Sequence, residues 1–478
     1  MLKGLFMHVL AKVVFVLCTY IIHLYLGKNL SAAEYGTIGV VITIITVNYN
    51  FLSNGARQSV SKLLASESYD EKSIIKRGST VQFIVAVILT LINFFGAPFL
   101  AKLLNANNME TYIKFSAIMI PFTAGYFLCV GSINGLKKFS VEAIIVTIYP
   151  LLRLTIIPYF KYVFEDSAIA TVSGFFTAAA VCFLISGLYL MSVLHKAPRK
   201  ERQVTNKIFF GNMSNFLIFF TCITLILNLD MLFVNALVQE QNQVGYYTGA
   251  VNFSKVSYYL LSAVYIVVLP TVSSLYSNKK IEEARKVINT LMSLICLFIL
   301  PIVSIVGGTT KQMLTSFYRA EYADASMTAT VLMISQFLIG LFVVLNMCVS
   351  ATQSNKFSTI LSIIVTGINI ILCWLLTQRY MIIGAAIASL CSSLFGCILT
   401  FIQIVKIYGN IISKETIKLI IFDFILFLVS CVFSNLMEEI NLVLLFGFYF
   451  VLYILFVGII IIAKQVNIEE IVKILKRK

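Results

Sequence analysis

Residues 79–101 read STVQFIVAVILTLINFFGAPFLA, a stretch without a single charged side chain. An α-helix rises about 1.5 Å per residue, so about 20 such residues cross a hydrocarbon core of roughly 30 Å. Apolar stretches of this length recur along the whole chain of 478 residues, of which 59% are hydrophobic. Only 12% of the residues are charged, against about 25% in soluble domains. The sequence therefore predicts an integral membrane protein.

The apolar stretches define the fold class, an all-α polytopic membrane protein with about 14 transmembrane helices. The connections between them are too short to hold a soluble domain. The predicted spans are residues 8–27, 36–58, 79–101, 113–133, 142–162, 168–194, 208–235, 246–270, 287–308, 326–350, 358–377, 383–407, 417–436 and 441–463.

Basic residues fall mostly on one side of the predicted membrane. With a cytoplasmic N-terminus, the cytoplasmic segments hold 26 Lys and Arg and the outer segments hold 7. Three more, Lys12, Arg153 and Lys255, lie within spans. The positive-inside rule then places both termini in the cytoplasm. Cytoplasmic loops beside anionic lipid headgroups account for the net charge of +15, so no nucleic-acid partner is expected.

Two short repeats indicate that the chain consists of related halves. KFS at 138–140 recurs at 356–358, and AIAT at 168–171 recurs as AIAS at 386–389, in the same register. A parallel repeat of six spans gives two pseudo-symmetric lobes related by an axis along the membrane normal. We therefore predict five parts: an N-terminal lobe at 1–195, a basic cytoplasmic linker at 196–207, a C-terminal lobe at 208–407, two further spans at 408–463 and an amphipathic cytoplasmic tail at 464–478.

Charged residues inside the predicted spans are the main candidates for a binding site, because each costs about 2.5–3.5 kcal/mol at the centre of a helix. Arg153 lies between Pro150 and Pro158, where two missing backbone donors are expected to loosen the helix and open a polar surface. Lys255 shares one helical face with Asn252. We expect this face to line a substrate cavity; interhelical hydrogen bonding is the alternative.

A second polar edge runs along the span 36–58 and includes Asn54, Arg57 and Ser61. Arg57 lies near the cytoplasmic end, and Lys12 lies only a few residues into the first span, so snorkelling to the interface competes with substrate contact. Asp230 either pairs with a neighbouring Lys or Arg or binds a coupling cation. The excess of cations inside the membrane favours a substrate that carries phosphate or another acid. The candidate substrate-binding residues are Arg153, Lys255, Arg57, Lys12, Asn54 and Asn252.

Catalytic and cofactor-binding patterns are absent from the sequence. The three histidines, His8, His23 and His195, are too scattered for a metal centre, and no C-x-x-C pair accompanies them. No G-x-x-x-x-G-K-[ST] run is present to bind ATP. Glycan polymerases and transferases usually need acids or histidines on sizeable outer loops, whereas the longest outer connection here is about 309–325. We expect a protein that is not an enzyme and needs no metal or cofactor.

Seven segments follow one another in a characteristic order: LSAAEYG at 30–36, NGAR at 54–57, LLA at 63–65, GSINGLKKF at 131–139, VGYYTGA at 244–250, LP at 269–270 and GAAIA at 384–388. With this order the chain resembles, over nearly its whole length, the polysaccharide (O-antigen-type) flippases of the multidrug/oligosaccharidyl-lipid/polysaccharide exporter superfamily, abbreviated MOP.

The resemblance implies a V-shaped pair of six-helix lobes around a central cationic cavity. It implies flipping of an undecaprenyl-pyrophosphate-linked oligosaccharide across the bacterial cytoplasmic (inner) membrane, for surface polysaccharide biosynthesis. By the same resemblance, Arg57, Arg153 and Lys255 bind the pyrophosphate or acidic sugars. The expected partners are this lipid-linked oligosaccharide, membrane lipids, and glycosyltransferases or a polymerase of the same pathway.

Three other functions stay open. An ion-coupled multidrug exporter of the same superfamily is expected to have a stronger acidic cluster in its N-terminal lobe, and the first six spans lack one. A lipid II flippase is compatible with the residues. A membrane enzyme that polymerises or transfers the glycan is the least favoured, because the predicted outer loops are short.

Overall fold

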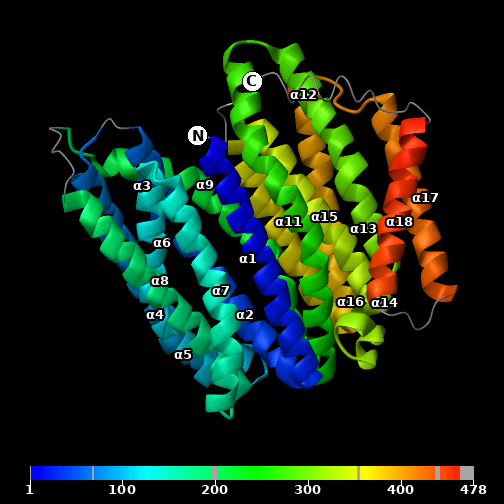
Figure 1. The fold of residues 1–478 in the computed structure, drawn as a ribbon, viewed down its shortest axis with the longest axis horizontal. Helices are drawn as coiled ribbons and strands as arrows, with labels where there is room; N and C mark the ends of the chain where they lie inside the picture. Colours follow the sequence, from blue (N-terminus) through cyan, green and yellow to red (C-terminus); the bar gives the residue numbers. More distant parts are fainter. Residues whose placement is uncertain are drawn as a thin grey trace. The chain divides into compact units, whose positions relative to one another are not determined.

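The computed structural model describes residues 2–66, 69–106, 108–195, 202–352, 356–436 and 442–462, and every regular element in these ranges is a helix (Figure 1). The predicted all-α class is confirmed. The elements are α1 (Leu2–Asn29), α2 (Ala32–Asn54), α3 (Ala56–Ala65), α4 (Glu71–Leu103), α5 (Met109–Ile118), α6 (Ile120–Gly135), α7 (Phe139–Val163), α8 (Ser167–His195), α9 (Asn206–Ile226), α10 (Leu229–Leu237), α11 (Gln241–Ser277), α12 (Ile281–Leu294), the π-helix η1 (Ile295–Ile299), α13 (Leu300–Gly308), α14 (Thr310–Phe317), the 3-10 helix η2 (Ala320–Ala325), α15 (Ser326–Ser350), α16 (Lys356–Tyr408), α17 (Lys414–Leu436) and α18 (Leu442–Ile462).

Tertiary contacts divide the chain into two compact units, Met1–Thr248 and Gly249–Lys478, with the boundary inside α11. The first unit includes α9 and α10 because both pack against α2. The predicted lobes, 1–195 and 208–407, therefore stay a prediction. Of the predicted linker 196–207, only residues from 202 onward are described, and the predicted tail 464–478 lies outside the described residues.

Nine helical segments in the described ranges are long and apolar enough to cross a membrane, or ten if the bent pair α5–α6 counts as one span. One of them, α16, contains two predicted spans, because the chain turns at Met381 (φ 53°, ψ −134°). Shorter apolar stretches occur at Val13–Asn29 and Leu444–Phe456. The multi-pass membrane architecture is confirmed, whereas the count of fourteen stays a prediction.

The apolar stretch 79–101 lies in α4, which begins earlier, at Glu71. Asp70 caps this helix, since its Oδ2 atom accepts a hydrogen bond of 2.8 Å from the Ser73 N–H. Beyond the charged first turns, α4 exposes large apolar side chains such as Phe95, which is 73% exposed. Exposed apolar surface on this scale is unfavourable in water and favourable against acyl chains. We therefore assign α4 as a lipid-facing helix.

Two predicted spans are broken where glycine or proline occurs. The span 36–58 becomes α2 and α3 because Gly55 leaves the helical conformation (φ −90°, ψ −115°). The predicted polar edge therefore crosses this break, since Asn54 ends α2 whereas Arg57 and Ser61 lie on α3, and it stays a prediction. The span 113–133 becomes α5 and α6, which are bent by 41° at a break that Pro121 follows.

Glycines allow α2 and α11 to cross at very short range within the first unit. A Cβ atom on Gly245 would lie 1.9 Å from the carbonyl oxygen of Ala32, and one on Gly36 would lie 2.7 Å from the Gly245 nitrogen. The backbones themselves fill this contact, so no side-chain rotation could relieve a substitution. The crossing therefore requires glycine at position 245.

Gly245→Ala is expected to destabilise the protein by about 3 kcal/mol or more, because the added methyl group must push two backbones apart. Gly96→Ala is the matched control, since nothing lies within 4 Å of its Cβ position in α4. Alanine is favoured over glycine inside a helix by roughly 0.5–1 kcal/mol, so this control should be neutral or stabilising. Thermal unfolding in detergent micelles measures both variants. Equal unfolding temperatures would refute the proposed constraint.

Candidate functional site

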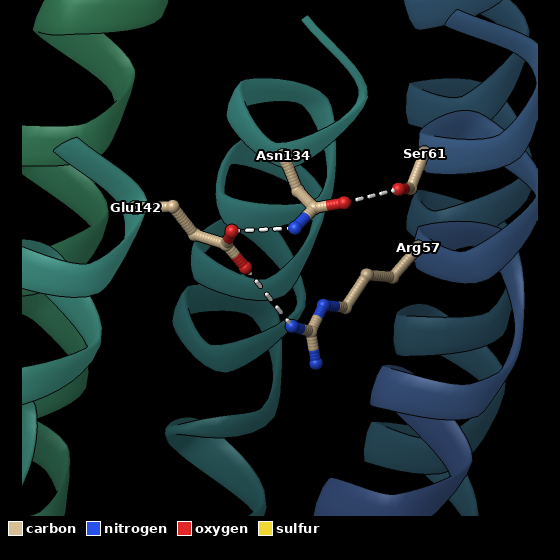
Figure 2. A network of polar contacts seen from close by, with 4 residues as sticks. All are labelled: Arg57, Ser61, Asn134 and Glu142. Carbon is tan, nitrogen blue, oxygen red and sulfur yellow. Dashed lines mark hydrogen bonds and ion pairs between the residues drawn. The ribbon is translucent and has the colours of Figure 1, made fainter. Parts of the chain in front are cut away.

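A polar network joins three helices of the first unit (Figure 2). Arg57 on α3 places its Nη2 atom 3.7 Å from Oε1 of Glu142 on α7. Asn134 on α6 donates a hydrogen bond from Nδ2 to the other carboxylate oxygen of Glu142. The Oδ1 atom of Asn134 accepts a hydrogen bond of 2.7 Å from the Ser61 hydroxyl. One carboxylate and one amide thus hold α3, α6 and α7 together.

Burial differs between the two ends of this ion pair. The Glu142 side chain is 0% exposed, and the Arg57 side chain is 25% exposed. A fully buried carboxylate is strongly unfavourable unless a cation or hydrogen-bond donors compensate its charge. Arg57 supplies the cation and keeps one edge accessible. The charge of Arg57 is therefore balanced by Glu142 inside the protein. An arginine that only snorkelled to the interface would not need such a partner.

Close approach of α6 to α3 positions this network. A Cβ atom on Gly131 would lie 2.5 Å from Cγ of Arg57, and one on Gly135 would lie 2.7 Å from the Ser61 carbonyl oxygen. The absence of side chains at Gly131 and Gly135 brings the two backbones together. Asn134, between these glycines, can then reach Ser61 on α3.

Aromatic rings lead from Arg57 toward Arg153 within the first unit. The Phe127 ring centre lies 5.7 Å from Cζ of Arg57, and the Tyr49 ring packs edge-on against it at 5.5 Å. The hydroxyl groups of Tyr49 and Tyr149 are hydrogen-bonded to each other. The Tyr149 ring centre lies 5.2 Å from Cζ of Arg153. We call Phe127, Tyr49 and Tyr149 the aromatic path.

Arg153 is buried among aromatic rings and is 4% exposed. Its Cζ atom lies 4.4 Å from the Phe175 ring centre and 5.5 Å from that of Phe15. Its Nη2 atom donates a hydrogen bond of 3.0 Å to the Thr19 hydroxyl on α1. The expected open polar surface between Pro150 and Pro158 is therefore wrong. Here α7 remains helical through both prolines, and aromatic side chains cover the guanidinium group.

The positive charge of Arg153 is not compensated by an acid in the part of the chain that the structure describes. No carboxylate of the described ranges lies within 4.0 Å of its guanidinium, and its Nε atom has no hydrogen-bond partner there. Cation–π contacts contribute about 0.5–2 kcal/mol, less than the several kcal/mol that burial of an ion costs. A buried cation with an unused donor is suited to receive an anion.

Asp230 is buried in the first unit and accepts two hydrogen bonds. The Tyr247 hydroxyl donates to Oδ2 at 2.8 Å, and the Met231 backbone N–H donates to Oδ1 at 2.8 Å. These donors stabilise a carboxylate without a metal ion. The predicted role of Asp230, in an ion pair or as a ligand of a coupling cation, stays a prediction.

The other predicted site residues lie on helices α1, α2 and α11. Lys255 and Asn252 are half-buried on α11 in the second unit, whereas Arg57 and Arg153 belong to the first. Asn54 is half-buried at the end of α2. Lys12 lies on α1, and its side chain falls outside the described part of the structure.

A cavity of about 520 Å³ lies elsewhere in the first unit. Glu34 lines it from α2, Tyr112 from α5, and Asp166 from the connection between α7 and α8. The Tyr112 hydroxyl donates a hydrogen bond of 2.7 Å to Asp166. The predicted orientation would place this cavity at the outer surface. None of the predicted site residues lines it.

Glu142 and Asn134 are site residues that we did not predict from the sequence. An acid in the first turn of the predicted span 142–162 is one available signal, because a carboxylate at that depth needs a partner. Asn134 lies inside the segment GSINGLKKF, where it is flanked by small residues. Neither signal identifies Arg57 as the partner, since that contact joins residues 85 positions apart.

Comparison with known families gives one sequence match. The model of a family described as "Polysaccharide biosynthesis protein" matches residues 26–327. This range covers more than half of the chain. No curated protein has a significantly similar sequence.

Three solved structures have similar folds and are distant in sequence. Lipid II flippase MurJ in an inward closed conformation matches with a TM-score of 0.68 at 15% identity, over 96% of this chain and 98% of that one. An inward-facing multidrug resistance MATE family transporter of the MOP superfamily matches with a TM-score of 0.62 at 12% identity, over 82% of this chain and 95% of that one. An outward-facing structure of a multidrug resistance MATE family transporter of the MOP superfamily matches with a TM-score of 0.62 at 12% identity, over 84% of this chain and 94% of that one. The chain shares the fold of these transporters.

Proposed function

The chain belongs to the polysaccharide biosynthesis protein family, and on that premise we propose that it is a flippase for a lipid-linked oligosaccharide. It moves an undecaprenyl-pyrophosphate-linked oligosaccharide across the bacterial cytoplasmic membrane by alternating access, for surface polysaccharide biosynthesis. Both termini face the cytoplasm, and glycosyltransferases or a polymerase of the same pathway are its partners. In this proposal the protein is a transporter and not an enzyme.

The uncompensated charge of Arg153 is the observation that supports this proposal most directly. Pyrophosphate is a concentrated anion, and a guanidinium group can bind it through two parallel hydrogen bonds. In the arrangement described above, Phe15 and Thr19 of α1 cover Arg153. We propose that α1 moves during transport and that the substrate anion then replaces the Thr19 contact.

The other candidate residues have supporting roles in this proposal. Arg57 presents its accessible edge to acidic groups of the substrate while Glu142 holds it in place. Lys255 and Asn252 are further substrate-binding candidates, as a point charge and a hydrogen-bonding amide. Lys12 and Asn54 are the weaker candidates for substrate contact. Asp230 is kept as an ion-pair or ion-coupling candidate.

Deletion of the gene tests the proposed function as a whole. We expect loss of surface glycan and accumulation of the lipid-linked oligosaccharide on the cytoplasmic side, both restored by a plasmid copy. Glycan staining, together with the accessibility of the lipid-linked sugar to an external glycosidase, measures these changes. Increased drug sensitivity with unchanged surface glycan would favour the multidrug exporter. Arrested cell-wall synthesis would favour the lipid II flippase.

Lys255→Ala is expected to lower glycan export by roughly tenfold, because a hydrogen bond from a charged group contributes about 1.5–3 kcal/mol. Lys311→Ala is the matched control, since Lys311 is exposed on α14 in the same unit. We expect normal export from the control. The assay is surface glycan per cell at equal amounts of membrane-inserted protein. Normal export from Lys255→Ala would remove Lys255 from the binding site.

A further inference from the structure

A buried acid in the second unit has no partner in the described part of the chain. Asp423 on α17 is 1% exposed, and both of its carboxyl oxygens lack a hydrogen-bond partner. A charged acid at such a position costs several kcal/mol, whether the surroundings are protein interior or lipid. A neutral carboxyl group avoids most of that cost. The chemistry of this position therefore favours a bound proton.

The described surroundings of Asp423 are largely apolar. Asp423 lies on the same face of α17 as Leu419 and Leu426, which pack with η1 in one apolar cluster. Cys296 of η1 belongs to this cluster, and Tyr449 and Tyr453 of α18 pack against it. Among the described residues, these three are the titratable side chains of the cluster.

The helices that pack on α17 bring no charged group to this level. Residues 300–308 of α13 contain no titratable side chain, and the charges of α12 lie in its first two turns, at 282–286. A Cβ atom on Gly308 would lie 2.6 Å from Cβ of Ser430, so α13 and α17 are in close contact. This packing excludes water from the cluster.

The neighbouring π-helix leaves a backbone carbonyl without its helical hydrogen-bond donor. In η1 the Leu300 N–H bonds to the carbonyl of Ile295, one residue further back than in an α-helix. The next residue, Pro301, has no N–H to donate. At least one carbonyl of Cys296 and Leu297 is therefore left without its helical donor. A carboxylate cannot satisfy a carbonyl oxygen, because both are acceptors, whereas a protonated carboxyl group can.

Asp423 has no hydrogen-bond partner among the described residues, and a carbonyl of η1 has lost its helical donor. We therefore propose that Asp423 is a proton-binding site. Its carboxyl group carries a proton and donates it in a hydrogen bond to the carbonyl left unpaired in the turn Cys296–Leu297. The ligand is one proton, and no other co-reactant is needed. Separation of α17 from η1 breaks this bond, admits water and releases the proton. In transport, each separation of α17 from η1 couples proton release to a change of conformation. This part of the inference rests on the proposed flippase function.

Infrared spectroscopy of the protein in lipid bilayers tests the site independently of transport. At pH 7 the wild type should show the stretching band of a protonated carboxyl group, and Asp423→Asn should lack it. Glu142→Gln is the control, because that buried acid is ion-paired and should not contribute. Asp423→Leu, which keeps the branched shape of the side chain without a carboxyl group, replaces Asp423→Asn if the latter does not fold. A band that is absent from the wild type, or that survives in these variants, would overturn the proposal.

Transport in proteoliposomes tests the coupling, with lipid-linked oligosaccharide extracted from membranes as the probe. A gradient of one pH unit should change the accumulation ratio of the wild type by up to about tenfold, if one proton moves per cycle. Asp423→Asn should still flip the lipid but lose this response. An equal response in both would overturn the coupling and leave the flippase function standing. Flipping by neither protein would count against the flippase function, while the infrared result would still decide the site.

Discussion

Replacing Arg153 by leucine is expected to lower glycan export by about 10- to 100-fold while leaving the protein at least as stable as the wild type. The guanidinium is buried without a carboxylate partner in the described residues, so its removal relieves a desolvation penalty. Leucine fits an environment formed by Phe175 and Phe15. The loss of export reflects loss of the anion contact, on the order of 10- to 100-fold for a hydrogen bond from a charged group. If Arg153 merely stabilised the bundle, its replacement would lower the stability of the protein without a specific loss of export.

The measurement compares surface glycan with the unfolding temperature in detergent for Arg153→Leu, Arg153→Lys and Lys161→Ala. Arg153→Lys keeps the charge without the planar fork, so we expect partial export. Lys161, a cation on the same helix α7, is the matched control and should export normally. If Arg153→Leu exports normally, Arg153 does not bind the substrate. If it unfolds, Arg153 is structural.

The Arg57–Glu142 pair is expected to dominate the stability of the first unit. Arg57→Met leaves the fully buried Glu142 without its cation and should destabilise the protein by about 3 kcal/mol. Adding Glu142→Gln removes the stranded charge and keeps the hydrogen bond from Asn134 possible. The double variant should therefore recover to within about 1 kcal/mol of the wild type. Glycan export should stay low, because Arg57 is still absent.

An exposed pair provides the control for this double-mutant cycle. Lys114 and Glu110 lie 2.6 Å apart on α5, and their side chains are 37% and 39% exposed. Their coupling energy should be below about 0.5 kcal/mol, because water screens both charges. Thermal unfolding of the two cycles gives the comparison. A coupling energy for Arg57 and Glu142 as small as that of the exposed pair would show that the buried pair is not structurally important.

The segments that carry the family resemblance pair with one another in the fold. LSAAEYG at 30–36 meets VGYYTGA at 244–250, where Gly36 and Gly245 bring two backbones together. NGAR at 54–57 meets GSINGLKKF at 131–139, where Gly131 packs on Arg57. Their small residues therefore have a structural explanation. Each pair of segments forms a close helix crossing. The crossing of α3 with α6 also positions Arg57.

The sequence by itself determined the class of the protein, because its apolar stretches and scarce charges depend only on local composition. It also identified Arg153 as a residue of interest, since a charge inside a span is costly wherever its neighbours lie. Helix breaks were only partly predictable. Gly55 and Pro121 permit a break, but the packing of neighbouring helices decides whether one occurs.

Only the tertiary structure decided the partners of the polar residues. Arg57 pairs with Glu142, 85 positions away, and Arg153 meets aromatic rings from α1 and α8 rather than an open polar surface. Asp423 is unusual because the packing buries it and neither of its carboxyl oxygens has a hydrogen-bond partner among the described residues. Local sequence specifies what a side chain can donate or accept. Which group lies opposite depends on how distant helices pack, and in this protein that packing distinguishes a balanced cation from an uncompensated one.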